Sequence, residues 1–397
     1  MRVLHVIPSI APVRGGTSQA ILEMVKSLRL HGVDAEIVTT NDNGEYLLEV
    51  PLRESIEYEE VPIWFFSRFS PTAKSIREFA FSRQLTAWLW QQIAQYDLLH
   101  VHAVFSYPAT IAMAIARFRT IPYISIPHGL LCQWSLEQSA SKKQIYLNLI
   151  ERANLQHSQA LHFTSKQEQR EASKLNLKPP SFILPHGLSV PAFIPNARYQ
   201  LRQRLNVPED EPIILFISRL HPKKGLEYLI PALGKLAYQR FTFVLAGSGS
   251  SEYEAEIDAL LIAAGIDKRT YRSGFVTGEM KDLLLQGSDV FALTSHSENF
   301  GVVVLEALAV GLPVLVTPGV ALASVVKQHQ LGYLAELDVA AIASAMKQLL
   351  NHRQETQVMG NRARQLILDQ YTWDGIALSL IEVYTAIVKK YPVPVFY

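Results

Sequence analysis

Two carboxylates stand eight residues apart in the segment SHSENFGVVVLEALAVGLPVLV, residues 295–316. Glu298 precedes Phe300-Gly301, where we expect a helix to begin, and Glu306 lies inside that helix. The helix is apolar all round, which predicts burial, and Gly311 is expected to end it. A buried carboxylate costs on the order of several kcal/mol unless it has a partner. A ribose diol would supply one, because a carboxylate accepts from two hydroxyls; a salt bridge to a distant Arg or Lys is the alternative.

Two cations follow another apolar run in ISRLHPKKG, residues 217–225. Arg219 comes directly after the run, and Lys224 stands five residues later, before Gly225. A guanidinium fork and a lysine point charge at the end of a strand suit a diphosphate. Solvated charges in a polar loop are the alternative interpretation.

Gly15-Gly16 lies between the first apolar run and the first helical pattern. Glycines there let the backbone approach a ligand, and helix N-terminal amides attract anions. An ordinary turn is the alternative. The segment is not GxGxxG, so the dinucleotide fingerprint of NAD enzymes is absent here.

The tetrapeptide PHGL occurs twice, with His128 in the first copy and His186 in the second. Each copy follows an apolar run, so either both histidines face a common site or one belongs only to a turn. His100 and His102 end a further predicted strand, where packing or hydrogen bonding is the expected role. We find no paired acidic triplet and no His/Cys cluster with ligand spacing, so no metal site is predicted.

The elements that must position these residues are short β-type runs that alternate with helical patterns. Helical spacing over residues 17–32 separates the first two runs. The predicted strands of the first half are residues 3–7, 35–39, 98–102, 123–127, 160–164 and 182–184. Those of the second half are residues 213–218, 241–246, 271–275, 290–294, 314–317 and 333–335.

This alternation predicts parallel βαβ units and doubly wound sheets. We expect an α/β protein of two facing Rossmann-like domains, residues 1–188 and 189–373, with a closing helix at 374–397 that packs back on the first domain. A Pro- and charge-rich segment, residues 195–212, is expected to separate the halves, with part of it helical as an alternative. Ligands bind beyond the carboxyl ends of such strands, which predicts one cleft between the two domains.

Composition narrows the class of protein. A length of 397 residues suits two domains, and 49% hydrophobic with 18% charged residues is normal for a globular protein. A net charge of +1 does not favour nucleic-acid binding. Cys132 is the only cysteine, so a reducing compartment fits best. The N-terminus does not read as a signal peptide, and the longest apolar run, residues 300–316, carries Glu306 and a Gly-Leu-Pro break, so it does not read as membrane-spanning.

These motifs together resemble the retaining glycosyltransferases of family 4, which have the GT-B fold. The resemblance runs through nearly the whole chain, and the order of the motifs makes it specific. It rests on Gly15-Gly16, LRLHGV at 28–33, DLLHVH at 97–102, His128-Gly129, residues 218–225, Gly247-Ser248-Gly249, the E-x7-E pair and YTWDGIALSLIEVY at 371–384. Asn299, His186 and Ser189 depart from the usual residues of the family, and Asn299 puts the donor sugar in doubt.

The resemblance implies transfer of a hexose from a nucleotide diphosphate sugar with retained configuration, without metal or cofactor. It assigns catalysis to His128, Arg219, Lys224 and Glu298, and makes His186-Gly187 a hinge turn. The implied donor-binding set is Gly15, Gly16, Arg219, Lys224, Gly274, Val276, Glu298, Asn299, Phe300, Gly301, Val302 and Glu306. UDP, as in UDP-glucose, is favoured only because it is common in the family. An epimerase or phosphorylase of the same fold, or a catalytically silent nucleotide-sugar binding module, are the alternatives.

The acceptor implied is a glycan or a lipid-linked molecule of polysaccharide or glycolipid biosynthesis. Residues 62–90 combine eight aromatic side chains with Arg68, Lys74, Arg77 and Arg83. This segment is either a surface that meets an acceptor at a membrane or, in part, an ordinary helix core. We expect a cytoplasmic protein, peripheral on the membrane if that surface binds lipid.

Overall fold

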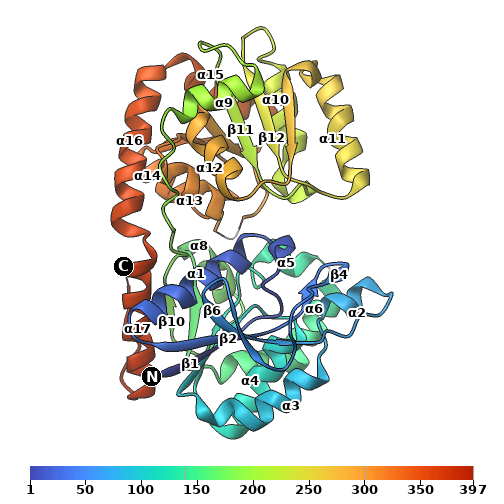
Figure 1. The fold of residues 1–397 in the computed structure, drawn as a ribbon, viewed down its shortest axis with the longest axis vertical. Coiled ribbons are helices and arrows are strands. Elements are labelled where there is room, and N and C mark those ends of the chain that lie inside the picture. The colour runs from blue at the N-terminus through green and yellow to red at the C-terminus, as the bar shows by residue number, and fades with distance from the viewer. Residues whose placement is uncertain (139, 299, 397) are drawn as a thin grey trace. The chain divides into compact units, whose positions relative to one another are not determined.

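The computed structural model describes residues 1–138, 140–298 and 300–396 and divides into two compact units. Unit 1 is Met1–Gly187 together with Trp373–Tyr397, and unit 2 is Leu188–Thr372 (Figure 1). Each boundary lies one residue from the boundary that the sequence predicts.

Among the described residues, unit 1 holds an eight-stranded sheet in the order β10-β9-β8-β7-β1-β2-β6-β5. Every neighbouring pair is parallel except β5 with β6. The strands are β1 (Arg2–Val6), β2 (Asp34–Thr40), β5 (Ser55–Tyr58), β6 (Val61–Phe66), β7 (Leu98–His102), β8 (Tyr123–Ile126), β9 (Ala160–Phe163) and β10 (Ser181–Ile183), with a separate ribbon of β3 (Asp42–Asn43) and β4 (Tyr46–Leu47).

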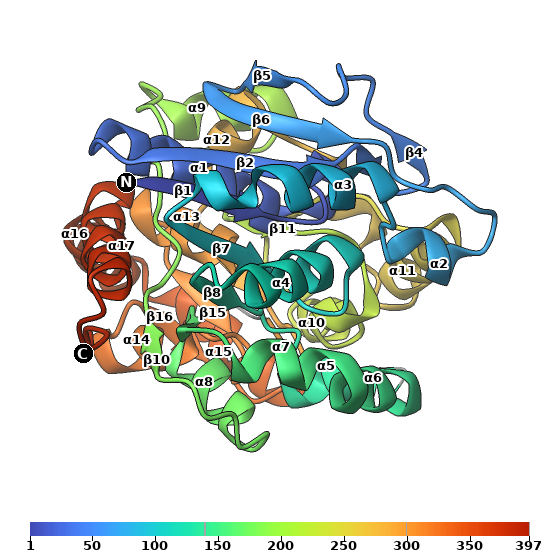
Figure 2. The same cartoon turned by 90° about the horizontal axis from the view of Figure 1, so that it is seen from below.

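Helices cover both faces of this sheet (Figure 2). One face packs on α1 (Gly16–Leu30) and α17 (Trp373–Val388), whose buried residues share a cluster with β1, β2 and β7. The other face packs on α3 (Arg83–Gln92) and α4 (Tyr107–Arg119). The remaining helices of unit 1 are α2 (Lys74–Glu78), α5 (Gln133–Glu137), α6 (Ala140–Tyr146), α7 (Arg152–Gln156) and α8 (Lys166–Ser173).

Unit 2 holds, in its described part, a six-stranded sheet that is parallel throughout, in the order β13-β12-β11-β14-β15-β16. The strands are β11 (Ile213–Ile217), β12 (Thr242–Ala246), β13 (Thr270–Gly274), β14 (Val290–Leu293), β15 (Val314–Val316) and β16 (Gly332–Leu334). The helices are α9 (Ala197–Leu205), α10 (Leu226–Gly234), α11 (Ser251–Ala263), α12 (Gly278–Gly287), α13 (Val302–Ala309), α14 (Ala323–His329), α15 (Val339–Asn351) and α16 (Arg353–Gln370).

The strand order reverses once in each sheet. In unit 2 the chain winds outward from β11 to β13 and then restarts beside β11 with β14. In unit 1 the equivalent reversal lies between β1 and β7. Ligands of doubly wound sheets bind where the order reverses, beyond the carboxyl ends of the strands. The fold therefore predicts ligand contacts in the loops that follow β1, β7, β11 and β14.

All twelve predicted strands are present, with ends that differ by at most one residue. The prediction missed the short strands β3 and β4, and it missed β5 and β6. Residues 62–66 read as part of an aromatic surface, but Phe65 and Phe66 are buried. The prediction was also wrong about residues 195–212 as the separator. The helix α9 lies there, inside unit 2, with Leu201 fully buried in its core.

Candidate active site

The loops after β11 and β14 carry the predicted cations and the first carboxylate of unit 2. They are joined backbone to backbone at Gly225, whose φ is +67°. A Cβ on Gly225 would lie 2.0 Å from the Thr294 carbonyl oxygen, so only glycine fits. The Thr294 hydroxyl donates to the Gly225 carbonyl at 3.0 Å. This contact fixes the loop that ends in Lys224 against the loop that leads to Glu298.

Lys224 and Glu298 form an ion pair across these loops. The two side chains are 13% and 19% exposed, so the pair is largely buried. The Glu298 N–H donates to the Gly319 carbonyl at 2.7 Å, and the Ala321 N–H donates to the Glu298 carbonyl at 3.1 Å. Gly319, after β15, is a positioning residue that sequence reasoning missed; the turn sequence TPGV was its only signal.

Arg219 follows β11 and is exposed. No ion pair within the described residues includes it. Its loop is held by the Leu220 N–H, which donates to the Ser248 carbonyl at 2.9 Å, and by Gly247, where a Cβ would lie 1.9 Å from the Ser218 carbonyl oxygen. The guanidinium therefore projects from a fixed turn at the strand-order reversal, where a free anion can meet it.

Gly301 is the N-cap of α13, with φ +76°, and Phe300 beside it is buried. The helix begins at Val302, and the Val304 N–H donates to the Gly301 carbonyl at 2.8 Å. N–H groups at the start of a helix that have no partner within it attract anions. Gly311, with φ +81°, follows the C-cap and ends the helix, as the sequence predicts. Asn299 lies outside the described residues.

The surroundings of Glu306 differ from the expectation in two respects, the burial of α13 and the partner of the carboxylate. Its side chain is 16% exposed, and Val302, Val303 and Val310 are also only partly buried, so α13 is not buried all round. Its Oε1 accepts from Lys281 Nζ, on α12, at 2.8 Å. The ion pair with a distant lysine, which the sequence left as the alternative to a ribose, is therefore formed. Nothing in the sequence around Glu306 pointed to Lys281, because the two helices meet only in the folded unit.

Gly274 ends β13 with φ +67°, and a Cβ there would meet no atom within 4 Å. The Gly247 N–H donates to the Gly274 carbonyl at 2.7 Å, which ties the loops after β12 and β13 together. Val276 is partly buried against the core, and Phe275 between them is exposed. An open glycine with free space above its Cα lets a flat group approach the backbone.

In unit 1, Gly15 caps α1 with φ +87°, and a Cβ there would also meet no atom within 4 Å. Gly16 is the first helical residue, and both glycines are exposed. The loop is held by Arg14, whose Nε and Nη2 donate to the Asp42 carboxylate at 2.7 and 2.9 Å. Asp42 also pairs with buried Arg68. The Gly15-Gly16 turn therefore lies open at the strand-order reversal of unit 1.

Six of the 12 histidines gather on the α1/α17 face of the unit 1 sheet. They lie on β1, β7 and β9 or just beyond the ends of β8 and β10, and they are His5, His100, His102, His128, His162 and His186. Three of them, His5, His100 and His102, have ring nitrogens within 4.8 Å of one another. Spacing along the chain gave no sign of this group. Strands β1 and β7 are about 95 residues apart in the chain, and only their pairing brings the rings together.

The two PHGL histidines are neighbours. The rings of His128 and His186 stack with centroids 5.4 Å apart and planes 15° apart. The family resemblance implied separate roles for them, whereas this contact agrees with the alternative that both face a common site. A Cβ on Gly187 would lie 2.4 Å from Trp373, so this glycine is needed where the chain re-enters unit 1.

Burial keeps these imidazoles neutral. It lowers the pKa of His5 and of His186 to about 3 and that of His162 to about 4. Burial, with neighbouring histidines, also lowers the pKa values of His100, His102 and His128 well below the usual range. His128, the partly exposed member, is therefore a hydrogen-bonding group near neutral pH and not a cation.

The aromatic segment 62–90 is divided between core and surface. Burial of Arg68, which pairs with Asp42, contradicts its expected role as a surface cation. Phe69, Phe81 and Trp90 are exposed, as are Lys74 and Arg83. No helix in the described part of the chain is long and apolar enough to cross a membrane.

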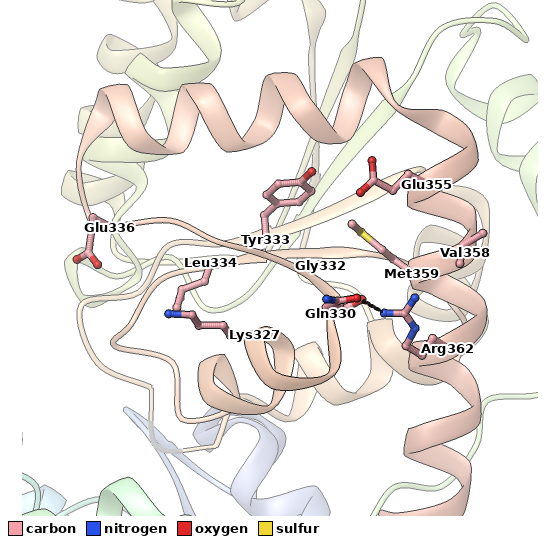
Figure 3. A pocket seen from close by; sticks show the side chains of 10 residues that line it. All are labelled: Lys327, Gln330, Gly332, Tyr333, Leu334, Glu336, Glu355, Val358, Met359 and Arg362. Atoms are coloured by element: carbon pink, nitrogen blue, oxygen red, sulfur yellow. Dashed lines mark hydrogen bonds between the residues drawn. The ribbon is translucent and has the colours of Figure 1, made fainter.

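A cavity of about 500 Å³ lies elsewhere in unit 2, beside the edge strand β16. Figure 3 shows its lining side chains, which come from β16, α14 and α16 and include Lys327, Glu355 and Arg362. None of the predicted donor-binding residues lines it. The Arg362–Gln330 hydrogen bond of 2.9 Å, drawn in Figure 3, joins α16 to the turn after α14.

Comparison with protein families identifies the class. The model of the family "Glycosyl transferase 4-like domain" matches residues 15–185, and the model "Glycosyl transferases group 1" matches residues 198–366. The two matches fall within unit 1 and unit 2, respectively. The chain is therefore a glycosyltransferase, an enzyme of the transferase class.

Relatives extend over different shares of the chain. A glycosyltransferase of Methanocaldococcus jannaschii is 31% identical over 188 residues, 47% of this chain and 48% of the relative, so that match spans about half of each. D-inositol 3-phosphate glycosyltransferase of Xylanimonas cellulosilytica is 26% identical over 95% of this chain and 93% of the relative. A Mycobacterium tuberculosis relative, 29% identical over 50% of this chain and 54% of the relative, is described as a GDP-mannose-dependent phosphatidylinositol monomannoside mannosyltransferase.

Solved structures show the same fold at low identity. Sucrose-phosphate synthase of Thermosynechococcus elongatus superimposes with a TM-score of 0.79 at 18% identity, over 98% of this chain and 100% of that one. HepE of Anabaena, in complex with UDP and glucose, gives 0.78 at 20% identity, over 97% and 100%. The chain has the GT-B fold, the two Rossmann-like domains that the sequence predicts.

Proposed function

We propose that this protein is a retaining, metal-independent hexosyltransferase that uses a nucleotide diphosphate sugar. The observation that carries the proposal is the arrangement of Arg219, Lys224 and the open N-terminus of α13 at the strand-order reversal of unit 2. All three offer positive charge or N–H donors to an anion. A diphosphate leaving group is the anion that this class of enzyme must stabilise.

The Lys224–Glu298 pair gives each partner a role. In the proposal, Lys224 turns to the diphosphate, and Glu298 accepts hydrogen bonds from hydroxyls of the transferred sugar. Since the pair lies in loops fixed by Gly225 and Gly319, neither loop needs to move far for this exchange. His128 and the Gly15-Gly16 amides are proposed as further contacts of the sugar and the diphosphate.

Nucleotide recognition is proposed at the ends of β13 and α13. The base would lie along the backbone at Gly274–Val276, where the free space above Gly274 suits a flat ring. Glu306 is proposed as the ribose contact, in which case the ribose hydroxyls compete with Lys281 for its oxygens. UDP, as in UDP-glucose, is our first choice of nucleotide. The UDP complex of HepE supports it as an example within the fold, whereas the mycobacterial relative is described as GDP-mannose-dependent.

Retention is proposed to occur by front-face substitution. A double displacement would need a carboxylate on the opposite face of the sugar. The candidate residues of unit 1, His128 and Gly15-Gly16, supply none. Mass spectrometry of the protein quenched during turnover should therefore detect no covalent glycosyl-enzyme, and a trapped adduct would refute this part of the proposal.

The proposal is tested by incubating the protein with UDP-, GDP- and ADP-hexoses and measuring nucleotide release, with and without glycan and lipid-linked acceptors. Slow hydrolysis of one donor without added metal, accelerated by an acceptor, is the expected result. Release that needs inorganic phosphate would favour a phosphorylase, and a change of sugar without nucleotide release would favour an epimerase. Binding of all donors without turnover would favour a silent binding module.

We further propose a glycan or lipid-linked acceptor of polysaccharide or glycolipid biosynthesis, met at a membrane by the exposed part of residues 62–90. The exposed apolar groups of that part include Phe69, Ile76, Phe81 and Trp90, and Lys74 and Arg83 are its exposed cations. Flotation with liposomes that contain anionic lipid should carry the protein, and Phe69→Ser with Phe81→Ser should abolish flotation. Equal flotation of the double variant would contradict the assignment.

A further inference from the structure

The histidines of unit 1 form two hydrogen-bonded chains that end differently. We call Tyr384, His100 and His162 the closed chain, and His5, His102 and His128 the open chain. Both lie on the same face of the sheet, and burial holds their imidazoles neutral. A neutral imidazole carries one N–H donor and one acceptor nitrogen, so the partners at the ends of a chain decide the direction of its hydrogen bonds.

The closed chain has one consistent arrangement of protons. The Leu184 carbonyl lies 2.8 Å from His162 Nε2 and can only accept, so this nitrogen carries the proton. His162 Nδ1 then accepts from His100 Nε2 at 3.3 Å. The remaining His100 Nδ1 accepts from the Tyr384 hydroxyl at 2.7 Å. Every nitrogen in this chain is satisfied, which is what a structural network requires.

The open chain is not satisfied at its ends. His5 Nδ1 lies 3.0 Å from His102 Nε2, and His102 Nδ1 lies 3.1 Å from His128 Nε2. The outer nitrogens, His5 Nε2 and His128 Nδ1, are buried and have no hydrogen-bond partner in the described structure. Three neutral rings hold three protons, and two of these lie in the internal hydrogen bonds. The third must therefore sit on one of the two outer nitrogens.

The two ends differ in their surroundings. His5 is fully buried within β1, whereas His128 lies in a turn beyond β8 and is partly exposed as a residue, although its Nδ1 atom is covered in this structure. A buried N–H without an acceptor costs more than it would at an end where a ligand supplies one. The third proton is therefore assigned to His128 Nδ1, and the hydrogen bonds run from His5 to His102 to His128.

The ring of His128 is also held in place. It lies between His102 and His186, with planes 15° from each and centroids 5.3 and 5.4 Å away. Its backbone has φ +53°, a left-handed conformation that costs a non-glycine residue energy and recurs at functional sites. The next residue, Gly129, donates its N–H to the buried Glu168 carboxylate at 2.5 Å, which anchors the turn.

We propose that His5 and His102 are positioning residues that fix the tautomer of His128, so that His128 offers Nδ1–H as a directed donor to an oxygen of the transferred sugar. The identity of that ligand rests on the proposed function; the tautomer does not. His102 acts by occupying His128 Nε2 as an acceptor, and His5 acts by occupying His102 Nε2. The closed chain has no part in this role, although its members are equally buried.

The tautomer is measured by ¹H–¹⁵N NMR of the full-length protein labelled at histidine side chains, with His128 assigned from its loss in His128→Gln. We expect His128 to be protonated at Nδ1 and His162 at Nε2. In His102→Phe, which removes both ring nitrogens of residue 102, the Nδ1 preference of His128 should be lost. In His102→Asn, whose amide N–H can still donate to His128 Nε2, it should be retained.

Activity separates positioning from stability. His102→Phe should lower kcat/KM for the donor about tenfold, the equivalent of one hydrogen bond, and His102→Asn should recover it to within about threefold. His162→Phe, which breaks the closed chain at the same depth, should lower the melting temperature similarly but change kcat/KM less than about threefold. These variants are matched in burial and differ in the chain that they interrupt.

Three results would overturn the inference. The first is protonation of His128 at Nε2 in the unmodified protein, and the second is an equal effect of His102→Phe and His162→Phe on the His128 tautomer. The third is stoichiometric binding of Zn²⁺ with shifts of the His5, His100 and His102 resonances. The last would mean that the cluster is a metal site, for which the nitrogen spacing would serve. If the tautomers are as expected but no donor releases nucleotide, the inference stands and the proposed function fails.

Discussion

Lys224 and Glu298 neutralise one another across two loops, and Glu306 is paired with Lys281. Each carboxylate of the E-x7-E pair thus has a lysine partner in the folded chain. Both pairs are largely buried, so removal of one partner leaves the other charge uncompensated, and stability must be measured beside ligand binding. Mutations at this scale can therefore separate a binding role from a structural one.

Lys224→Ala should lower kcat by about 100- to 1000-fold, because loss of one preorganised donor to developing charge costs about 3–4 kcal/mol. Steady-state nucleotide release measures this loss, and a melting curve checks that the fold survives. Lys223→Ala, one residue earlier in the same turn, is the matched control and should retain activity within about threefold. Full activity of Lys224→Ala would remove Lys224 from the mechanism.

Glu306→Gln tests the ribose contact. If the carboxylate binds the ribose, the donor KM should rise about tenfold, since a hydrogen bond to a charged acceptor is worth about 1.5–3 kcal/mol. Lys281→Met removes the competing cation and should leave KM unchanged or lower it. Should both variants instead lower the melting temperature alike and leave KM unaltered, the ion pair is only structural.

The loops of unit 2 are fixed at the scale of the element by glycines at which backbones touch. Gly225, Gly247 and Gly319 each leave no room for a Cβ, because a carbonyl oxygen of a neighbouring loop lies at 1.9 to 2.2 Å from its position. These contacts join the ends of β11, β12, β14 and β15 into one rigid rim. Preorganisation of the cations depends on that rim more than on the cations' own contacts.

Gly225 and Gly265 both have φ +67°, but only Gly225 is crowded, which makes them a matched pair. Gly265→Ala should cost about 1–2 kcal/mol, the cost of the left-handed conformation alone. Gly225→Ala should cost at least about 3 kcal/mol, because the backbone must also shift. Urea unfolding followed by circular dichroism measures both. Equal losses would mean that the Thr294 contact does not constrain the loop.

At the scale of the whole molecule, the buried histidines make unit 1 sensitive to acid. Their folded pKa values are lowered, to about 3 for His5 and His186 and about 4 for His162, against about 6.5 when unfolded. The unfolded chain therefore binds more protons between these values, so stability is full above about pH 6.5 and falls as the pH falls below it. Glu151 and Glu168, whose pKa values burial raises, oppose this trend in the same unit.

Each of these histidines should remove about 1.2 kcal/mol of unfolding free energy between pH 7 and pH 5.5. The chain's five tryptophans, Trp64, Trp88, Trp90, Trp134 and Trp373, all lie in unit 1, so urea unfolding followed by tryptophan fluorescence reports on this unit. His162→Phe should reduce the loss of unfolding free energy between pH 7 and pH 5.5 by the contribution of one histidine. His157→Gln, at an exposed position, should leave that loss unchanged. A stability that does not vary between pH 7 and 5.5 would contradict the buried, neutral cluster.

Much of the fold could be predicted because its signals are local. Each strand of the two parallel sheets that is buried on both faces is a nearly continuous apolar run, and such runs are legible without knowledge of their neighbours. Strands β5 and β6 were not predicted, because β6 is an aromatic run next to the sheet edge, where the sequence pattern of a strand resembles that of an apolar surface. The sequence of residues 195–212 indicates a separator, with a partial helix only as the alternative, because its charges hide the apolar face of α9.

Within the candidate site, the sequence by itself determined the residue types and the strand ends that carry them: Arg219, Lys224, Glu298 and His128. Only the tertiary structure decided which residues form ion pairs and hydrogen bonds with them. Lys281 reaches Glu306 from a helix 25 residues earlier in the chain, and Gly319 supports Glu298 from the turn after β15. The histidine chains need β1, β7, β8 and β9 side by side and α17 above them. Spacing along a chain sets which side chains share a face, but pairing between distant strands, which no local pattern encodes, sets which of them touch.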